Sequence, residues 1–285
     1  MDGGGKDGLV GEVERVVAQH LQFYRTIGLD EVRAGPPSAR QRCWVFPDTQ
    51  HAIGVGQPES RGERIISVAP NLTELLFAAG AAEQVVAVSE YSDYPEAAKQ
   101  LPRIGDAFRL DYERIVALAP TVAVIWETGT PAGVAKRLED LGIRVVGIPT
   151  HRLDDIAEGL VELGELAGTQ AVAEAAARDF RERIGKLRAE YRNRPRLRVF
   201  IHIDDAPLYT VGGDHLITEI IELCGGVNVF AEATSLALPV DLESVLVRAP
   251  QVILSTDDGD PAEYWSRFGQ LEAVANGNVF RIAVS

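Results

Sequence analysis

Aromatic side chains that follow predicted strands are the residues of this sequence best suited to holding a ligand. Tyr91 opens the loop Tyr91-Ser-Asp-Tyr-Pro95 after the apolar run Gln84–Ser89, and Trp126 ends the buried run Val122–Trp126. Ligand sites of α/β proteins form beyond the carboxyl ends of strands, and a phenol or an indole offers a flat apolar face with one polar atom. We therefore expect both rings to line a binding site. A loop tyrosine and a half-buried core tryptophan are the alternatives.

Residues that could perform catalysis or bind a metal do not form a known motif. The sequence lacks a Gly-x-Ser-x-Gly elbow, a phosphate-binding Gly/Lys loop and a His-Glu-x-x-His zinc motif. One stretch gathers candidate metal ligands: His202, Asp204, Asp205, Asp214 and His215. They lack helical ligand spacing, and alternate residues of a strand point to opposite faces, so we expect a turn with solvated carboxylates. The sequence therefore predicts neither an enzyme nor a metal site.

Composition excludes further classes of protein. The chain has 285 residues and a formal net charge of −14, so we expect no nucleic-acid partner, because phosphates would be repelled. No segment approaches the ~20 consecutive apolar residues of a membrane-spanning helix. Cys43 and Cys224 are too few and too far apart for a disulfide framework or a cysteine zinc site. These features predict a soluble globular protein with room for two domains.

The sequence contains an internal repeat. Asp111–Ile125 recurs as Asp241–Ser255 with matching Asp, Glu and Pro, and Thr73–Gly80 recurs as Thr218–Gly225. The longer copies are typical of an amphipathic helix that stops at proline and is followed by an apolar strand. Two like units predict two like lobes, and a cleft between such lobes is a natural place for a ligand.

The repeat makes Glu113 and Glu243 equivalent, one in each predicted lobe. Both lie in the first turn of a predicted helix, after the expected N-caps Asp111 and Asp241. The helix dipole favours a carboxylate in the first turn, so a purely structural role explains these glutamates as well.

Strands alternate with helices on both sides of one long helical segment. Before it, helices separate four predicted strands, at 64–69, 84–89, 122–126 and 144–148. Thr169–Tyr191 is one uninterrupted helical pattern, about 35 Å long at ~1.5 Å per residue. The alternation resumes at Leu197–Ile203 and ends at Val279–Val284. The predicted fold class is α/β, with two Rossmann-like lobes of mainly parallel sheets joined by a single long α-helix.

Three segments resemble the cobalamin-binding proteins of ABC importers: Ser67–Gly80, Tyr91–Pro95 and Leu110–Pro120. That family is a branch of the helical-backbone metal-complex receptors (class III substrate-binding proteins), whose other branches bind haem and siderophores. The pentapeptide Tyr91–Pro95 is the piece most typical of the cobalamin branch. The resemblance covers roughly residues 64–285, in matching order and spacing.

The resemblance implies a binding function without catalysis. A protein of this kind captures cobalamin, a corrinoid, between its lobes and delivers it to a dimeric ABC permease and its ATPase. Cobalamin is then the transported ligand, and no intrinsic cofactor is implied. We expect a monomer in the periplasm or cell envelope, although the start of the chain lacks a signal-peptide pattern. The alternatives are a haem- or ferric-siderophore-binding protein of the same superfamily and a truncated homologue that binds nothing.

The resemblance also implies roles for individual residues. Tyr91 matches a tyrosine that packs on the corrinoid, and Trp126 matches an aromatic residue of the cleft wall. Glu113 and Glu243 match two glutamates that dock onto arginines of the permease. The repeat supplies a physical reason, because a pseudo-twofold protein can present one carboxylate to each subunit of a symmetric dimer.

The sequence departs from the family pattern at two tryptophans. One is replaced near Ala107, where Phe108 is the neighbouring aromatic residue, and the other is replaced by Leu238, just before Pro239. Phe108, Leu238 and the aromatic Tyr209 complete the predicted ligand-binding set.

Four regions are predicted along the chain. They are an N-terminal appendage of unknown role, partly helical (1–62), the N-lobe (63–167), the inter-lobe helix (168–195) and the C-lobe (196–285). The family's last pocket-lining stretch would follow Ser285, so we expect the C-lobe to be truncated at its C-terminus.

Overall fold

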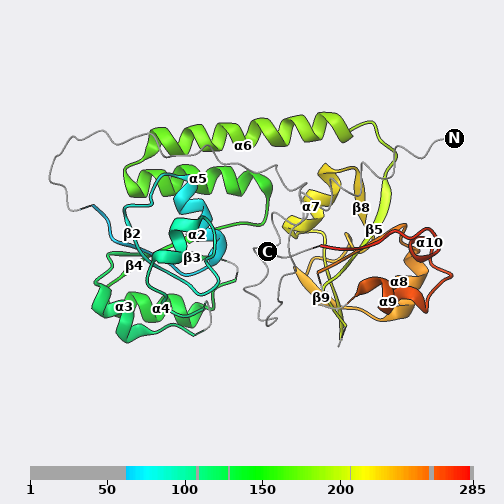
Figure 1. The fold of residues 1–285 in the computed structure, drawn as a ribbon, viewed down its shortest axis with the longest axis horizontal. Coiled ribbons are helices and arrows are strands. Elements are labelled where there is room, and N and C mark those ends of the chain that lie inside the picture. The colour runs from blue at the N-terminus through cyan, green and yellow to red at the C-terminus, as the bar shows by residue number, and fades with distance from the viewer. Residues whose placement is uncertain (1–61, 107–108, 128, 206, 257–259, 283–285) are drawn as a thin grey trace. The chain divides into compact units, whose positions relative to one another are not determined.

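The computed structural model describes residues 62–282, with gaps at 107–108, 128, 206 and 257–259 (Figure 1). Residues 1–61 of the predicted appendage and Phe108 therefore lie outside the described residues. The described chain forms two compact units. The first contains the residues up to Ile148 together with Gly159–Ala176, and the second contains Pro149–Glu158 and the chain from Ala177 onward.

Helices α5 (Leu153–Ala167) and α6 (Gln170–Tyr191) each contribute residues to both units. Helix α6 is the single long helix that the sequence predicts, and it begins one residue after the expected cap Thr169. Four of its apolar positions are buried: Ala173, Ala177, Ile184 and Tyr191. Most other positions are exposed, which agrees with a helix that packs along one narrow stripe.

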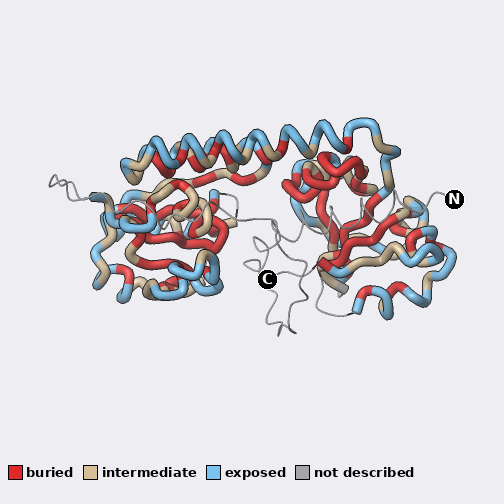
Figure 2. Tube along the Cα trace, turned by 45° about the horizontal axis from the view of Figure 1, so that its top comes forward, coloured by how far each residue is buried: buried red, intermediate tan, exposed pale blue. Residues whose placement is uncertain are grey.

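The first unit is built on a four-stranded parallel sheet in the order β2-β1-β3-β4. The strands are β1 (Ile65–Ser67), β2 (Val85–Val88), β3 (Val122–Trp126) and β4 (Arg144–Ile148). The helical elements are α2 (Pro70–Ala78), the 3-10 turn η2 (Glu96–Gln100), α3 (Tyr112–Leu118) and α4 (Ala132–Asp140). Every residue of β3 is buried, as expected for a central parallel strand with helices on both faces (Figure 2).

The second unit contains another four-stranded parallel sheet, in the order β11-β10-β5-β8. Its strands are β5 (Leu197–His202), β8 (Gly226–Asn228), β10 (Val252–Ser255) and β11 (Val279–Arg281). Its helices are α7 (Leu216–Leu223), α8 (Leu242–Arg248), α9 (Pro261–Ser266) and α10 (Glu272–Ala275). The predicted α/β class with mainly parallel sheets is thus confirmed.

A small antiparallel sheet in the second unit was not predicted. It consists of β6 (Asp204–Asp205), β7 (Leu208–Val211) and β9 (Ala237–Pro239). Strands of two to four residues show too few positions for a period-of-two pattern, and β9 contains a proline and lies largely exposed.

The sequence repeat is also a repeat of local structure. The Asp111 carboxylate accepts a hydrogen bond from the Arg114 backbone N–H (3.0 Å), and the Asp241 carboxylate accepts one from the Ser244 backbone N–H (2.6 Å). These bonds satisfy N–H groups that the first turn leaves without a helical partner. Hydrogen bonding to Ser244 also lowers the pKa of Asp241.

Helices α3 and α8, the two helices of the sequence repeat (the repeat helices), end in the same way, and an arginine binds the C-terminal end of each. Helix α3 ends at Ala119 (φ 49°) and α8 at Ala249 (φ 46°), both in the left-handed conformation. The Arg64 Nε donates to the Ala119 carbonyl (3.1 Å), and the Arg198 Nε donates to the Ala249 carbonyl (2.8 Å). The repeat therefore includes an arginine near the start of a strand in each unit. The sequence comparison missed it because the arginine-to-helix spacing differs between the copies.

The cap at Asp111 gives a prediction about stability. Asp111→Ala should lower the free energy of unfolding by about 1 kcal/mol, because the first turn of α3 loses its side-chain acceptor. Chemical denaturation measures this change. Asp111→Asn is the matched control, since asparagine caps helices about as well as aspartate. An equal loss in both variants would contradict the capping role.

Candidate ligand-binding and docking residues

Tyr91 occupies a strained position in the loop that follows β2. Its φ is +62°, in the left-handed region where bulky residues are rare, and 47% of its surface is exposed. Tyr94 in the same loop is also exposed. A backbone conformation of this kind costs of order 1–3 kcal/mol and persists only where its surroundings fix it. The loop thus presents a phenol ring to solvent at an energetic cost.

Buried hydroxyl groups fix the base of this loop. The Thr73 hydroxyl donates to Ser67 Oγ (2.8 Å), and it shares a further hydrogen bond with Ser92 Oγ (3.0 Å). Ser92 Oγ in turn lies 3.1 Å from Ser89 Oγ. All four residues are buried, so the network links β1, α2 and the end of β2 directly to the residue after Tyr91.

Arg103 holds the same loop through its backbone. One guanidinium nitrogen donates to the Ser89 and Ser92 carbonyls, at 3.0 Å each, and the other lies 3.7 Å from an Asp93 carboxylate oxygen. A charged donor to two carbonyls of one loop favours a single loop conformation. Neither Arg103 nor the hydroxyl network was predicted, although serine directly after a strand is a signal that could have pointed to them.

The first two turns of α2 contain the buried polar side chain of Asn71 and the partly buried one of Glu74. Both side-chain polar atoms of Asn71 are buried and have no hydrogen-bond partner among the described residues. One turn later, burial raises the pKa of the Glu74 carboxyl to about 7, although part of that residue stays exposed. Burial, and then the charge of Glu74, raise the pKa of Tyr94. This corner of the first unit therefore holds an unpaired amide and a carboxyl group that titrates near neutral pH.

Glu74 gives a pH-dependent prediction. The folded state binds its proton more tightly than the unfolded chain, whose carboxyl titrates near 4.5. The stabilisation of the protonated form is complete below pH 4.5 and is lost as the pH rises through about 7. Glu74→Gln should match the wild type in acid and exceed it by up to about 3 kcal/mol at pH 8. Urea unfolding at several pH values measures the difference, and a constant difference across pH would contradict this account.

Trp126 lies at the end of β3 but is only 8% exposed. The chain turns tightly after it, since the Thr130 N–H donates to the Trp126 carbonyl (2.8 Å). A Cβ at Gly129 would lie 1.7 Å from the indole ring, so the ring rests directly on the Gly129 backbone. In this structure the indole offers little free surface, and its predicted role in the cleft wall stays a prediction.

The contact between Trp126 and Gly129 can be tested. Gly129→Ala should destabilise the protein by about 1–3 kcal/mol, because the new methyl group and the rigid indole cannot occupy the same space. Gly133→Ala, inside α4 and with no atom near its Cβ, is the control and should be neutral or slightly stabilising. Thermal unfolding compares the two. Similar midpoints would show that the indole is not packed on Gly129.

Tyr209 and Leu238 both lie on the small antiparallel sheet, on the neighbouring strands β7 and β9. The register pairs Tyr209 with Pro239 and Leu238 with Thr210. Directly paired residues share a face, and adjacent residues of a strand face opposite sides, so the two side chains lie on opposite faces of this sheet. The structure therefore does not bring them together on one surface.

Glu113 and Glu243 are both exposed, in the first turns of α3 and α8. An exposed valine accompanies each: Val116 (55% exposed) and Val247 (82% exposed). Spacings of three and four residues place each valine on the same helix face as its glutamate. Each repeat helix thus presents a carboxylate beside a small apolar group to solvent.

The two histidines of the stretch with candidate metal ligands are both buried. His202 is buried among aromatic rings, and its Nδ1 accepts a hydrogen bond from Trp265 Nε1 (3.3 Å). His215 Nδ1 accepts one from the Ile217 backbone N–H (3.1 Å) and caps α7. Burial, and then nearby His151, lower the pKa of His215 to about 4. Both rings thus have structural partners, which the spacing of polar residues could not show.

Neither a metal-binding cluster nor a membrane-spanning helix is present in the described residues. No group of three or more histidine, cysteine, aspartate or glutamate side chains within them could hold a metal ion. None of the helices that the structure describes combines the length and apolarity needed to cross a bilayer.

Comparison with known proteins shows the family. Residues 65–283 match the periplasmic binding protein family. The chain belongs to that family. The vitamin B12-binding protein of Vibrio cholerae serotype O1 is 36% identical over 219 residues, covering 77% of this chain and 74% of the relative. The vitamin B12-binding protein of Yersinia pestis (strain Pestoides F) is 39% identical over 198 residues, covering 69% and 70%.

Solved structures agree with this assignment. The crystal structure of the periplasmic vitamin B12-binding protein of Vibrio cholerae matches with a TM-score of 0.70 at 36% identity, covering 77% of this chain and 87% of that one. The periplasmic heme-binding protein of Roseiflexus sp. RS-1 matches with a TM-score of 0.68 at 24% identity, covering 77% and 89%, which shows a shared fold alone. This periplasmic binding protein therefore shares the fold of its relatives.

Proposed function

We propose that this protein is a substrate-binding protein that captures a corrinoid of the vitamin B12 class and delivers it to an ABC permease. The observation that carries the proposal is the likeness, at 36% identity over 77% of the chain, to proteins named for vitamin B12 binding. The fixed Tyr91 loop supports it, because a phenol ring held in solvent at a strained position is suited to contact with a large ligand.

Binding in this proposal rests mainly on apolar contact. Tyr91 packs on the corrin edge, with Trp126 as a further contact residue. Tyr209 and Leu238 are the other candidates, and because they lie on opposite faces of the small sheet, one of the two faces the ligand. Apolar burial contributes ~25 cal/mol per Å², so several hundred Å² can support micromolar or tighter binding after association costs. Proteins that share only the fold include heme-binding ones, so haem and ferric siderophores are the competing ligands.

Delivery in this proposal uses the repeat helices. The exposed Glu113 and Glu243 dock on basic side chains of a dimeric permease whose ATPase drives transport, and the protein acts as a monomer in the periplasm. An exposed ion pair contributes only ~0.2–1 kcal/mol. The glutamates therefore set the orientation and the rate of association rather than most of the affinity.

A competition experiment tests the ligand. The purified protein is mixed with equimolar cyanocobalamin, hemin and ferrichrome, separated from free ligand by gel filtration, and its visible spectrum is recorded. The proposal expects the corrinoid spectrum in the protein fraction. A haem spectrum would assign the protein to the haem-binding relatives, and a colourless fraction would indicate a homologue without this function.

A further inference from the structure

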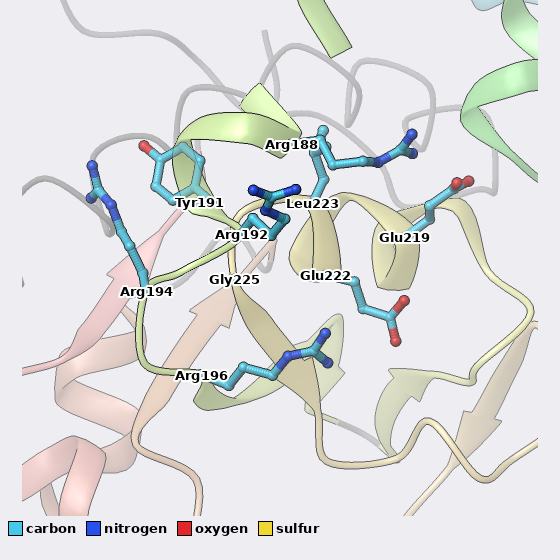
Figure 3. Close-up of a pocket in the computed structure, with 9 residues that line it drawn as sticks. All are labelled: Arg188, Tyr191, Arg192, Arg194, Arg196, Glu219, Glu222, Leu223 and Gly225. Carbon is cyan, nitrogen blue, oxygen red and sulfur yellow. The ribbon is translucent and has the colours of Figure 1, made fainter. Parts of the chain in front are cut away.

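A cavity of about 260 Å³ lies in the second unit, where α6 ends and the chain leads into β5. It is lined by side chains from the end of α6, from the segment after it and from α7, shown in Figure 3. The lining residues that carry charge are Arg188, Arg192, Arg194, Arg196, Glu219 and Glu222. We call this cavity the arginine pocket. None of its residues belongs to the predicted ligand-binding or docking sets.

Most guanidinium groups of the arginine pocket form no ion pair with a described residue. Arg194 pairs with Glu190 (3.0 Å) and stacks on the buried Tyr191 ring (4.4 Å to its centre). For Arg188, Arg192 and Arg196, no described carboxylate lies within ion-pair distance. Three arginines that have no ion-pair partner among the described residues therefore border one cavity, in a chain whose net charge is −14.

The two glutamates of the pocket do not cancel these charges. Glu219 accepts a hydrogen bond from the Leu153 backbone N–H (2.7 Å) and lies 3.7 Å from Arg152, so its charge is already balanced. Glu222 is exposed and forms no ion pair with a described residue. In the view of Figure 3, the Glu222 carboxylate lies nearer to the Arg196 guanidinium group than to that of Arg192. The pocket thus has an excess of positive charge and one acceptor.

The helix dipole explains only part of this arrangement. Cations are favoured in the last turn of a helix, which accounts for Arg188 and for Arg192 just beyond the end of α6. Arg196 lies beyond the range of that effect, next to the start of β5. Arg196 nevertheless lines the same cavity. The helix end alone does not explain this arginine, whereas a bound anion would.

We propose that the arginine pocket binds a phosphate ester. The planar guanidinium group matches the geometry of phosphate oxygens and can donate two parallel hydrogen bonds to them. Glu222 is placed to accept a hydrogen bond from a hydroxyl or ammonium group on the ester. A cavity of about 260 Å³ has room for a phosphate with a small substituent but not for a large chelate. A free phosphate ester and the headgroup of a phospholipid share this chemistry.

The test uses the full chain at low ionic strength, because contacts between guanidinium groups and phosphate are screened by salt. Calorimetry with sn-glycerol 3-phosphate probes the soluble source, and cosedimentation with phosphatidylglycerol vesicles, with neutral phosphatidylcholine vesicles as baseline, probes the lipid source. Saturable binding in either arm supports the proposal, provided that Arg192→Gln/Arg196→Gln weakens it about tenfold or more. Arg192→Lys/Arg196→Lys keeps the charge without the planar fork and should give an intermediate affinity.

The matched control is Arg114→Gln/Arg181→Gln, which removes two exposed arginines outside the pocket and should leave binding unchanged. Absence of saturable binding in both arms would overturn the proposal. Equal weakening by the control would also overturn it, because the effect would then come from net charge alone. Thermal unfolding of each variant confirms that it folds. Since the readout contains no corrinoid, failure of this proposal is distinct from failure of the proposed transport function.

Discussion

The double variant Glu113→Arg/Glu243→Arg should lose at least about nine-tenths of its stimulation of the permease ATPase, while it binds corrinoid like the wild type. Both glutamates are exposed, so the substitutions leave the buried cores unchanged. In the proposed docking, each charge reversal replaces an attraction to a basic side chain of the permease by a repulsion. Electrostatic steering changes association rates by factors of about 10 to 1,000 at low salt, so the loss should be largest there.

The control for this experiment reverses two exposed glutamates that lie outside the repeat helices. Glu158→Arg/Glu263→Arg makes the same change in net charge on α5 and α9 and should leave ATPase stimulation near the wild-type value. Each single variant, at Glu113 or Glu243, should show a partial loss, because the proposed docking gives each permease subunit one carboxylate. If the double variant stimulates the ATPase as well as the control does, the docking role of these glutamates is wrong.

Tyr91→Gly should make the protein more stable and weaken its corrinoid binding about tenfold or more. Glycine adopts φ +62° without strain, so the free energy of unfolding should rise by about 1 kcal/mol. The same change removes an exposed ring, and burying an aromatic side chain contributes roughly 1.5–3 kcal/mol to binding. If Tyr91→Gly raises the free energy of unfolding and lowers the affinity for corrinoid, the strained backbone at this position serves ligand binding.

Two further variants at Tyr91 separate the effect of backbone strain from the effect of the contact between its ring and the ligand. Tyr91→Ala removes the ring but keeps a side chain in the left-handed conformation, so affinity should fall without the gain in stability. Tyr91→Phe keeps the ring and should bind nearly as well as the wild type. Urea unfolding and calorimetry measure the two quantities for each variant. Wild-type affinity in Tyr91→Gly would show that this ring does not contact the ligand.

The elements with strong hydrophobic periodicity could be predicted from the sequence. The pattern at Thr169–Tyr191 became α6, one residue shorter, and the apolar run Val122–Trp126 became the fully buried β3. The repeat predicted that Asp111 and Asp241 cap equivalent helices, and both carboxylates do so. Such features follow from local pattern and capping chemistry, which act over a few residues.

Features that depend on contacts between distant residues could not be predicted in this way. The sequence does not show that the Tyr91 backbone is left-handed, because the hydroxyl groups and Arg103 that fix the loop come from separate elements. Nor could the spacing of polar residues show that His215 is buried as the cap of α7. Trp126 was expected at a cleft wall, but its burial depends on the turn at Gly129.

The measurement that tests the central claim most directly is a calorimetric titration of the purified protein with cyanocobalamin, with hemin and ferrichrome titrated in parallel. Our account predicts one saturable site per chain for cyanocobalamin at micromolar or tighter affinity, weakened in Tyr91→Gly, and much weaker binding of the other two ligands. No saturable heat with cyanocobalamin, or tighter binding of hemin, would contradict it.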